Sequence, residues 1–495
     1  MEPRSAVAAT TPTTSVGRTL LLGAGLALIP AAIDLIFLGR YGWHRDELYF
    51  LSAARHPSLG YVDFPALTAW FGRAVVELAG PSLDLLRVAT AVASWSSVVF
   101  AALIARELGG SLRAQAIAAA TWACSPLVLG AASIFHPTML DIGAQVATLW
   151  LATRATVRED PRVWLPAGIV AGVGIEAKYT ILLTLAALAV ALAVTRRGRR
   201  HLRSPWLWAG VGVAAALWVP NHGWQLQHGW PSLAFSSSQR AETAADTPPL
   251  AYGAQSVLFA GAGAVLAIVG VHRLWRRDLA VLALVPVLVY AGWLLERGRG
   301  YYPVPALAVA VAAGAIAAER RPRLLVGAAA VGLATLAIAG PVVVPMLPQR
   351  FAIDHGYVDA GFFKDEFGWP ELADQVATAW RAQSFEPGRA VVLAENYGEA
   401  GALARYGPSR GLPTPLSGHL SWQYWRPRSL PQRDALMVGF DPADLARLCR
   451  TWRVVSRIRN AEGVDNEERG RPIARCRLTA PLGVLWDREV ARTSL

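Results

Sequence analysis

The sequence predicts an α-helical polytopic membrane protein of about 11 transmembrane helices, with a C-terminal extracytoplasmic α/β domain. Three observations predict this class. Of the 495 residues, 54% are hydrophobic and only 17% are charged. Several uncharged stretches reach about 20 residues, which as a helix span about 30 Å of hydrocarbon. Arginines gather in short segments between these stretches, as the positive-inside rule describes.

Eleven apolar segments are the predicted spans. They lie near residues 19–39, 84–105, 114–132, 138–153, 163–175, 179–195, 206–220, 251–270, 279–295, 303–318 and 324–346. Arg-rich connections such as RRGRRHLR (196–203) alternate with Arg-poor ones, so the former are predicted to be cytosolic, together with the N-terminus. The alternation requires the segment 163–195 to cross twice, with a turn around GIEAKYT (174–180). An odd number of spans then places the tail outside.

Three regions are predicted to lie outside: the first outer loop, a second loop at 221–250 and the tail. We predict a transmembrane domain at 1–346, whose first outer loop is 40–82, and a tail domain at 347–495. In the loop, apolar residues recur at helical spacing from Leu67 to Leu78, which favours a helix lying in the membrane interface. In the tail, RAVVLAENYGEAGALARYG reads as a strand leading into a helix, and RVVSRIRN and RPIARCRLT read as strands. Cys449 and Cys476 could pair if the tail lies outside the cytosol.

The formal net charge of +12 does not require a polyanionic partner. Because the arginines follow the topology pattern, we predict contact with the lipid bilayer and no nucleic-acid partner. The scattered histidines lack metal-ligand spacing, and the sequence has no DxD pair, so no metal-binding residues are predicted. Whether a divalent metal is needed stays open, and no cofactor is predicted with certainty.

Acidic residues at predicted membrane boundaries are the candidate catalytic groups. WHRDELYF (43–50) places Asp46 and Glu47 directly after the first span. Interfacial solvation would explain them, but the same loop also holds His44 and Asp63, and a carboxylate there could act as a general base. Asp141, in FHPTMLD, lies at the outer end of a span, where an acid normally faces a cavity or a partner. Packing against a hydroxyl or an arginine is the alternative for Asp141.

Cations and polar side chains at the same predicted face could bind a phosphate or a sugar. Lys178 lies at the turn between two short predicted helices, and either pairs with a nearby acid or contacts a phosphate. The positive-inside rule disfavours arginines in outside loops, so the arginines of ERGRGYYPVP need an explanation. This segment either binds a phosphate or forms an aromatic belt with flanking charges. Its candidates are Arg297, Arg299, Tyr301 and Tyr302. Asn221, His222 and Gln225 could bind sugar hydroxyls or cap a helix.

Several of these blocks, in this order, resemble those of the GT-C glycosyltransferases. HRDELYF, LGYVDFPAL, FHPTMLD, GIEAKYT, PNHGWQLQHGWP and GYYPVP are similar to blocks of the bacterial relatives of protein O-mannosyltransferases (glycosyltransferase family 39-like) and of the lipid A aminoarabinose transferase. DEFGWPELA, ENYGEAGAL and SGHLSWQYW resemble the outer domain of many bacterial members. The family usually has two prolines after the loop aspartate, whereas Asp63 is followed by Phe64, Pro65 and Ala66.

The resemblance implies an inverting transfer of a sugar from a polyprenyl-phosphate co-substrate to an acceptor protein, glycolipid or cell-wall glycan. This would occur at the outer face of a bacterial plasma membrane. By the resemblance, Asp46 is the general base, Glu47 its acidic neighbour and Asp141 the second acidic position. Lys178 and residues 297–302 would face the donor phosphate. His44, Tyr61 and Asp63, together with Asn221, His222 and Gln225, are the candidate sugar-binding residues.

A transporter or flippase of lipid-linked sugars is the competing function. It too needs many helices and charge at membrane depth, but it does not need a folded outer domain of this size. The hydropathy also shows no internal repeat of the kind that transporters often have. A structural subunit without activity would leave the acidic pair unexplained. The sequence leaves the sugar, the acceptor and the oligomeric state open.

Overall fold

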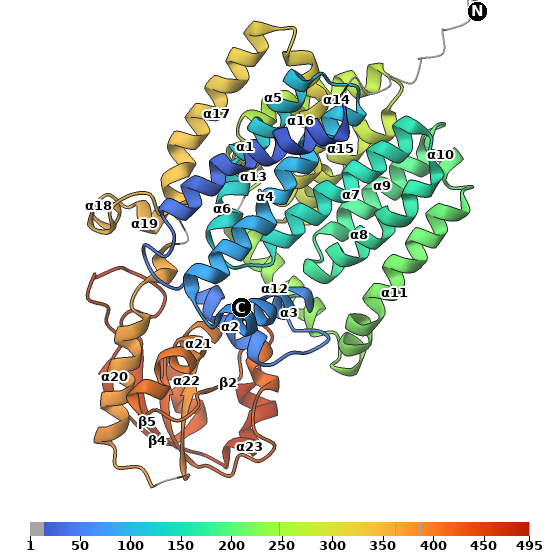
Figure 1. The fold of residues 1–495 in the computed structure, drawn as a ribbon. Coiled ribbons are helices and arrows are strands. Elements are labelled where there is room, and N and C mark those ends of the chain that lie inside the picture. The colour runs from blue at the N-terminus through green and yellow to red at the C-terminus, as the bar shows by residue number, and fades with distance from the viewer. Residues whose placement is uncertain (1–13, 247, 362, 387, 495) are drawn as a thin grey trace, which may run out of the picture. The chain divides into compact units, whose positions relative to one another are not determined.

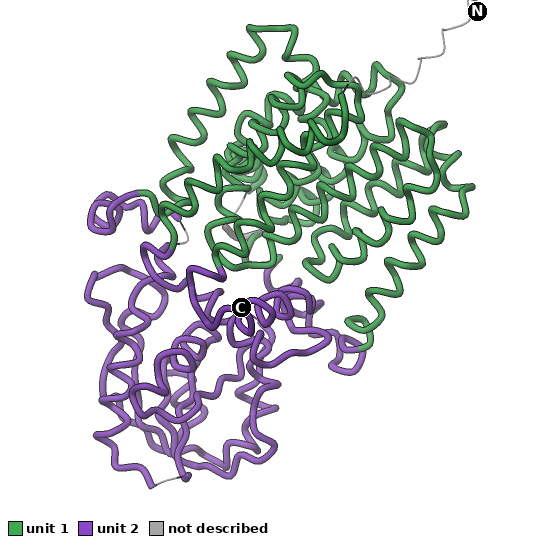
Figure 2. Tube along the Cα trace, viewed as in Figure 1, with its two compact units in different colours: residues 1–38, 87–223, 240–346 green, residues 39–86, 224–239, 347–495 purple. Residues whose placement is uncertain are grey.

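The computed structural model describes residues 14–246, 248–361, 363–386 and 388–494. Its chain separates into two compact units, coloured in Figure 2. Unit 1 comprises residues 1–38, 87–223 and 240–346, and unit 2 comprises residues 39–86, 224–239 and 347–495. Unit 2 therefore gathers the predicted first outer loop and the predicted tail domain. The N-terminus predicted to be cytosolic begins with residues 1–13, which lie outside the described part of the chain.

Unit 1 is built from helices (Figure 1). Ser15 caps the first of them by accepting a hydrogen bond from the Arg18 amide, and Ser111 caps another through the Ala114 amide, as expected of serine at an N-cap. Its helices, two of which (α4 and α11) run on into unit 2, are α1 (Val16–Ile36), α4 (Leu83–Glu107), α5 (Leu112–Ala123), α6 (Pro126–Ser133), α7 (Thr138–Arg158), α8 (Trp164–Ala177), α9 (Ile181–Val194), α10 (Gly198–His201), α11 (Pro205–Gln227), α13 (Pro249–Ala260), α14 (Ala262–Arg276), α15 (Ala280–Leu295), α16 (Ala308–Ala318) and α17 (Pro322–Val343).

The predicted number of spans is not confirmed. Among the described residues, three helices are long and apolar enough to cross a membrane, or up to five if each of two bent pairs counts as one span. The pairs are α5 with α6, bent by 54°, and α13 with α14, bent by 98°. The predicted span at 251–270 is therefore not one straight helix, because the chain turns at Gly261, whose φ of +58° favours glycine.

Two other predicted segments show different outcomes. The stretch 163–195 forms two helices, α8 and α9, separated by a break at Lys178, which confirms the predicted turn. The predicted outer loop at 221–250 is instead mostly helical, because α11 continues to Gln227 and α12 (Pro231–Asp246) follows it.

Close helix packing in unit 1 depends on small residues. A Cβ added to Gly270 of α14 would lie 1.7 Å from the carbonyl oxygen of Ala310 in α16. A Cβ added to Gly314 of α16 would lie 2.0 Å from the carbonyl oxygen of Leu266. The two backbones therefore touch, as small residues allow in membrane helix pairs.

Unit 2 contains a five-stranded mixed sheet of order β2-β1-β3-β5-β4, with helices beside it (Figure 1). β1 pairs in parallel with β2 and β3, whereas β5 pairs antiparallel with β3 and β4. The predicted strand at 390–394, the helix after it and the two later strands are all present. The strands are β1 (Ala390–Ala394), β2 (Leu416–Ser417), β3 (Asp434–Val438), β4 (Cys449–Arg457) and β5 (Pro472–Leu478). The helices, including α12 with its end in unit 1, are α2 (Arg45–Arg55), α3 (Leu67–Ala79), α12, α18 (Gln349–Asp354), α19 (Tyr357–Ala360), α20 (Trp369–Ala382), α21 (Tyr397–Tyr406), α22 (Pro442–Leu448) and α23 (Leu482–Leu485).

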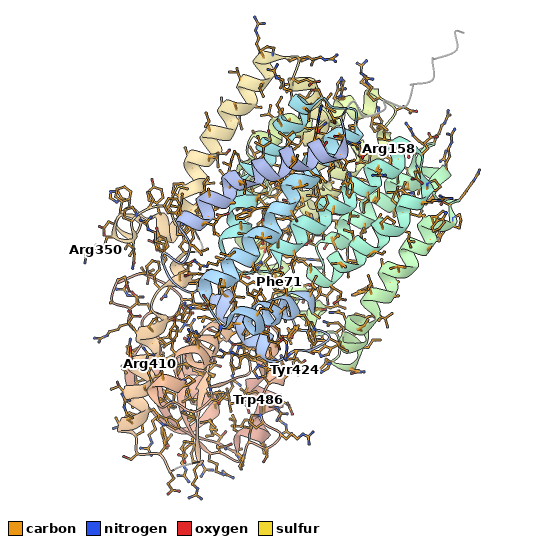
Figure 3. The ribbon with its side chains drawn as sticks, viewed as in Figure 1. Phe71, Arg158, Arg350, Arg410, Tyr424 and Trp486 are labelled. Atoms are coloured by element: carbon orange, nitrogen blue, oxygen red, sulfur yellow. A yellow bond between two sulfur atoms is a disulfide. The ribbon has the colours of Figure 1, made fainter. Side chains whose placement is uncertain are left out.

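Large apolar side chains form the core beside this sheet. Trp486 is 1% exposed and lies in one apolar cluster with Met437 and Leu445, and Figure 3 marks its position among the side chains of the unit.

The helix α3 forms at the predicted place. It keeps Trp70 and Leu78 exposed on one side, an apolar face that suits the predicted position in a membrane interface.

A disulfide joins Cys449 of β4 to Cys476 of β5. Closing a loop with a sequence separation of 27 residues stabilises a fold by about 2–4 kcal/mol. We therefore expect Cys449→Ser to lower the free energy of unfolding of the sheet by about this amount. Pulse proteolysis in urea, with the peptides of residues 390–478 followed by mass spectrometry, measures it. Cys124→Ser, which removes the free cysteine of unit 1, is the control; equal stability of both variants would contradict the prediction.

Candidate functional site

The acidic pair predicted from WHRDELYF begins helix α2 in unit 2. His44 is its N-cap, and the His44 Nδ1 accepts a hydrogen bond from the Asp46 amide at 3.1 Å. The His44 amide in turn donates to Glu47 Oε2 at 2.9 Å, which completes a capping box. Glu47 is fully buried, whereas the Asp46 side chain is 25% exposed. The two neighbouring acids therefore differ: Glu47 holds the start of the helix, and Asp46 faces outward.

Asp46 has a partner far away in the sequence. The Tyr397 hydroxyl donates a hydrogen bond to Asp46 Oδ1 at 2.8 Å. The Arg45 guanidinium lies 4.7 Å from the centre of the Tyr397 ring and forms an ion pair with Glu467. The Tyr397 hydroxyl therefore holds the Asp46 carboxylate in one orientation.

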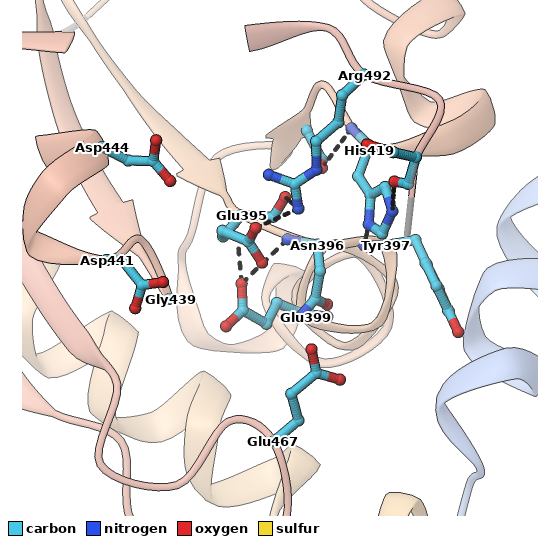
Figure 4. Close-up of polar contacts among 12 residues, drawn as sticks. Glu395, Asn396, Tyr397, Glu399, His419, Gly439, Asp441, Asp444, Glu467 and Arg492 are labelled. Atoms are coloured by element: carbon cyan, nitrogen blue, oxygen red, sulfur yellow. Dashed lines mark hydrogen bonds and ion pairs between the residues drawn. The ribbon is translucent and has the colours of Figure 1, made fainter. Parts of the chain in front are cut away.

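Helix α21 holds Tyr397 in place, because it packs closely on α2. A Cβ added to Gly401 would lie 2.9 Å from the Leu48 Cβ. Asn396 caps α21 through the Glu399 amide at 2.9 Å, and Glu399 accepts from the Asn396 amide at 3.4 Å. Figure 4 shows this second capping box, which starts α21 at Tyr397.

Buried polar groups surround this start of α21 (Figure 4). Arg492 forms an ion pair with Glu395, and the Tyr397 amide donates to His419 Nδ1 at 3.3 Å. Burial, with the charge of Arg492 in addition, lowers the pKa of His419 to about 3. His419 is therefore neutral at physiological pH and can accept this hydrogen bond.

A second carboxylate, Asp63, lies in the same unit. The Tyr49 hydroxyl donates to Asp63 Oδ1 at 2.6 Å, and the Tyr49 ring lies 4.9 Å from the Tyr397 ring. The Ser421 amide donates to the Tyr49 oxygen at 3.2 Å. Burial raises the pKa of Asp63 from 3.8 to about 7, and the charge of Asp46 raises it further against the lowering effect of the Tyr49 hydroxyl.

Stability should therefore depend on pH through Asp63. The pKa of Asp63 is raised from 3.8 to about 7 in the folded state. Between these two pH values the folded state therefore binds more protons than the unfolded state. The contribution of Asp63 is fully present below about pH 4 and is lost as the pH rises through about 7. We expect the melting temperature of Asp63→Asn, relative to that of wild type, to rise between pH 4 and pH 8. Parallel melting curves across this range would contradict the assignment.

Two predicted sugar-binding residues have structural contacts in unit 2. The Tyr61 ring stacks on Phe64, with centroids 4.5 Å apart, and the Gln225 amide donates to the Tyr61 carbonyl at 2.9 Å. Ser232 donates to Gln225 Oε1 at 3.0 Å. Gln225 therefore stabilises, by a hydrogen bond to its backbone, the loop that carries Tyr61 and Asp63.

In unit 1, Asp141 lies buried in the first turn of α7. Thr180 donates to Asp141 Oδ2 at 2.7 Å, and the Gln145 amide donates to both carboxylate oxygens at 3.0 and 2.9 Å. Hydroxyl and amide partners satisfy this acid, which matches the packing alternative considered for it.

Lys178 lies at the break between α8 and α9, beside the predicted tyrosines. Its Nζ donates to Thr138 Oγ1 at 2.9 Å. The same ammonium lies 5.1 Å from the centre of the Tyr302 ring and 5.5 Å from that of Tyr301, within the range of cation–π attraction. Unit 1 thus brings Lys178, Tyr301 and Tyr302 together, with Thr138 linking the lysine to the start of α7.

The other predicted residues of unit 1 lie differently. The Tyr179 hydroxyl donates to Asn221 Oδ1 at 2.7 Å, which leaves the buried Asn221 amide nitrogen without a partner among the described residues. His222 contacts the Trp218 ring, with centroids 5.2 Å apart. Arg297 and Arg299 are both exposed, and Arg297 has a φ of +53°. Both predicted phosphate-binding arginines are therefore more exposed than Lys178, which is half-buried.

Sequence reasoning missed the residues that support these acids and cations. Tyr397 lies in the block ENYGEAGAL and Thr138 in the block FHPTMLD, so the quoted motifs contained them without singling them out. Arg45 stands between His44 and Asp46, where it reads as an interfacial charge. Within the described ranges, no group of three or more His, Cys, Asp or Glu side chains has the geometry of a metal site.

Comparison with known proteins gives one family match and a common fold. Residues 63–224, less than half of the chain, match the family described as dolichyl-phosphate-mannose-protein mannosyltransferase. A search of curated proteins finds no match. The fold is similar to that of ArnT from Cupriavidus metallidurans bound to undecaprenyl phosphate, with 15% sequence identity, a TM-score of 0.53, and coverage of 94% of this chain and 99% of that one. For ArnT in the apo state the identity is 15%, the TM-score 0.52 and the coverage 93% and 98%.

These matches agree with the ordered motifs. The family match includes the blocks around Asp63, Asp141, Lys178 and Asn221, and the shared fold extends over almost the whole chain. The resemblance to the GT-C glycosyltransferases that the motifs predict is thereby confirmed.

Proposed function

We propose that this protein is an inverting glycosyltransferase of the membrane. It moves a sugar from a polyprenyl-phosphate donor to an acceptor on the outer face of the plasma membrane. The observation that carries the proposal is the hydrogen-bonded, partly exposed Asp46 at the start of α2, in the motif that resembles the family's general base. ArnT, which has a similar fold, binds undecaprenyl phosphate, and this supports a lipid-linked donor.

Asp46 takes the proton of the acceptor hydroxyl in this mechanism. The freed oxygen attacks the anomeric carbon from the face opposite the phosphate, the bond from that carbon to the phosphate oxygen breaks, and the configuration inverts. Tyr397 holds the Asp46 carboxylate by a hydrogen bond, and Arg45 lies over the Tyr397 ring. The departing lipid phosphate carries the developing negative charge.

Lys178 stabilises that leaving phosphate. Its ammonium donates a hydrogen bond to Thr138 and lies near the faces of two aromatic rings, Tyr301 and Tyr302. This leaves donor capacity for phosphate oxygens. Electrostatic stabilisation of developing charge is usually the largest single catalytic contribution. Glu47, which holds the start of α2, and Asp141, which binds Thr180 and Gln145, serve as positioning residues. Asn221 offers a buried amide donor to the sugar.

The disulfide supports an extracytoplasmic tail. Disulfides persist in oxidising compartments and are rare in the cytosol, so Cys449–Cys476 fits a multi-pass topology that places residues 347–495 outside. The eleven apolar segments and the two-domain division at residue 346 belong to the same proposal.

A transport assay separates this function from that of a flippase. Proteoliposomes containing the full chain are given a panel of radiolabelled polyprenyl-phosphate sugars, together with a crude acceptor extract of bacterial envelopes. A transferase detaches the label from the lipid, whereas a flippase moves the intact labelled lipid across the bilayer. Detachment from at least one donor is expected. Translocation of intact donor without detachment would overturn the proposal.

A further inference from the structure

A pocket lies in unit 1 at the ends of several helices, away from the candidate donor site. It has a volume of about 360 Å³ and is lined by Gly109 after α4, Val157 in the last turn of α7, Arg197 after α9, and Arg273 in the last turn of α14. Asp141 lies in the first turn of α7. At about 1.5 Å per residue, the 16 steps to Val157 correspond to about 24 Å. The pocket and the Asp141–Lys178 region are therefore at opposite ends of the same helices.

The pocket carries an excess of positive charge. Five of its lining residues are arginines and one is a glutamate, which gives +5 − 1 = +4. They are Arg197, Arg273, Arg277, Arg320, Arg321 and Glu319. Arg197 has an ion pair with Glu159 at 3.3 Å, and Arg320 lies 4.0 Å from Glu319. No ion pair in the described part of the chain involves Arg273, Arg277 or Arg321.

Ordinary placement of arginines accounts for only part of this arrangement. Arginine is favoured near helix C-termini and on the cytosolic side of membrane proteins, which explains exposed residues such as Arg276 and Arg323. It does not require five arginines to line one pocket. The hollow also has an apolar part, formed by Leu274, Leu279 and Ile316.

We propose that this pocket binds a phosphate-bearing anion. Guanidinium groups bind phosphate oxygens in a bidentate, planar geometry, and basic pockets between membrane helices are typical sites for anionic lipid head groups. The volume falls within the range of about 300–1,000 Å³ for small-molecule sites. The apolar wall suits the glycerol and first methylene groups of a phospholipid, but a free phosphate would meet the same guanidinium groups.

Binding to the purified full chain in detergent tests the proposal. The probes are dioctanoyl phosphatidylglycerol, inorganic phosphate and, as a zwitterionic control, dioctanoyl phosphatidylcholine. The test variant is Arg273→Gln with Arg277→Gln. The matched control is Arg276→Gln with Arg323→Gln, which removes the same charge from exposed positions outside the pocket. Melting temperatures without ligand establish that both variants are folded.

The test variant should bind the phosphatidylglycerol probe about tenfold more weakly than wild type, because charged hydrogen bonds to phosphate are lost. The control variant should bind it like wild type. The same pattern with inorganic phosphate identifies free phosphate as a sufficient ligand, and its restriction to the lipid identifies the head group. Failure of wild type to bind either probe would overturn the proposal, as would equal weakening in both variants or equal affinity for phosphatidylcholine.

Discussion

Asp46→Asn is expected to lower the rate of sugar release from a polyprenyl-phosphate donor by about 100- to 10,000-fold, the usual contribution of a general base. Asparagine keeps the size of the side chain and an oxygen that can accept the Tyr397 hydrogen bond, but it cannot take the proton of the acceptor. Donor binding should therefore persist. Initial rates with a radiolabelled donor, together with photolabelling by a donor analogue, measure both quantities.

Asp359→Asn is the control for this prediction. Asp359 is an exposed acid of unit 2 in the short helix α19, and its replacement removes the same charge without touching α2. This variant should release sugar at the wild-type rate. Unchanged release by Asp46→Asn would move the base to another acid, with Asp141 the next to test.

Lys178→Met is expected to have the second largest effect, lowering turnover by about 100- to 1,000-fold, as removal of a single charge-stabilising donor does in other enzymes. Methionine preserves most of the length and apolar stem of lysine, so packing against Tyr301 and Tyr302 should remain. What is lost is the ammonium that holds the leaving phosphate. Turnover and donor affinity should be measured for the same preparation, since a phosphate contact affects both.

The chain offers a matched control, because its other lysine is Lys364. Lys364 lies half-buried in unit 2, in a short 3-10 turn (Phe363–Glu366). Lys364→Met removes the same charge and should leave turnover within the error of wild type. A loss of activity in both lysine variants would point to stability rather than to phosphate binding.

Local features of the fold could be predicted from the sequence. The break at Lys178 follows from arginines at both ends of 163–195, and the strand at 390–394 follows from its apolar run before Asn396. The bend between α13 and α14 could not be predicted, because an apolar run reads the same whether Gly261 is helical or has a positive φ. Hydropathy also does not distinguish a spanning helix from a bent pair.

The candidate site, too, could be predicted only in part from the sequence. The resemblance of HRDELYF selected Asp46, but the sequence does not distinguish it from Glu47, whose role in the capping box depends on backbone geometry. Tyr397 could not be linked to Asp46 from the sequence, because 351 residues separate them. Such a contact depends on the packing of α2 against α21 around Gly401.

The most direct test of the central claim is to measure the lipid product. Purified protein in liposomes is incubated with each polyprenyl-phosphate sugar and with envelope acceptors, and mass spectrometry follows the appearance of polyprenyl phosphate without sugar. We expect it to form with at least one donor, in step with labelling of the acceptor, and not to form with Asp46→Asn. Intact donors throughout, with wild-type protein that binds them, would contradict the assignment as a glycosyltransferase.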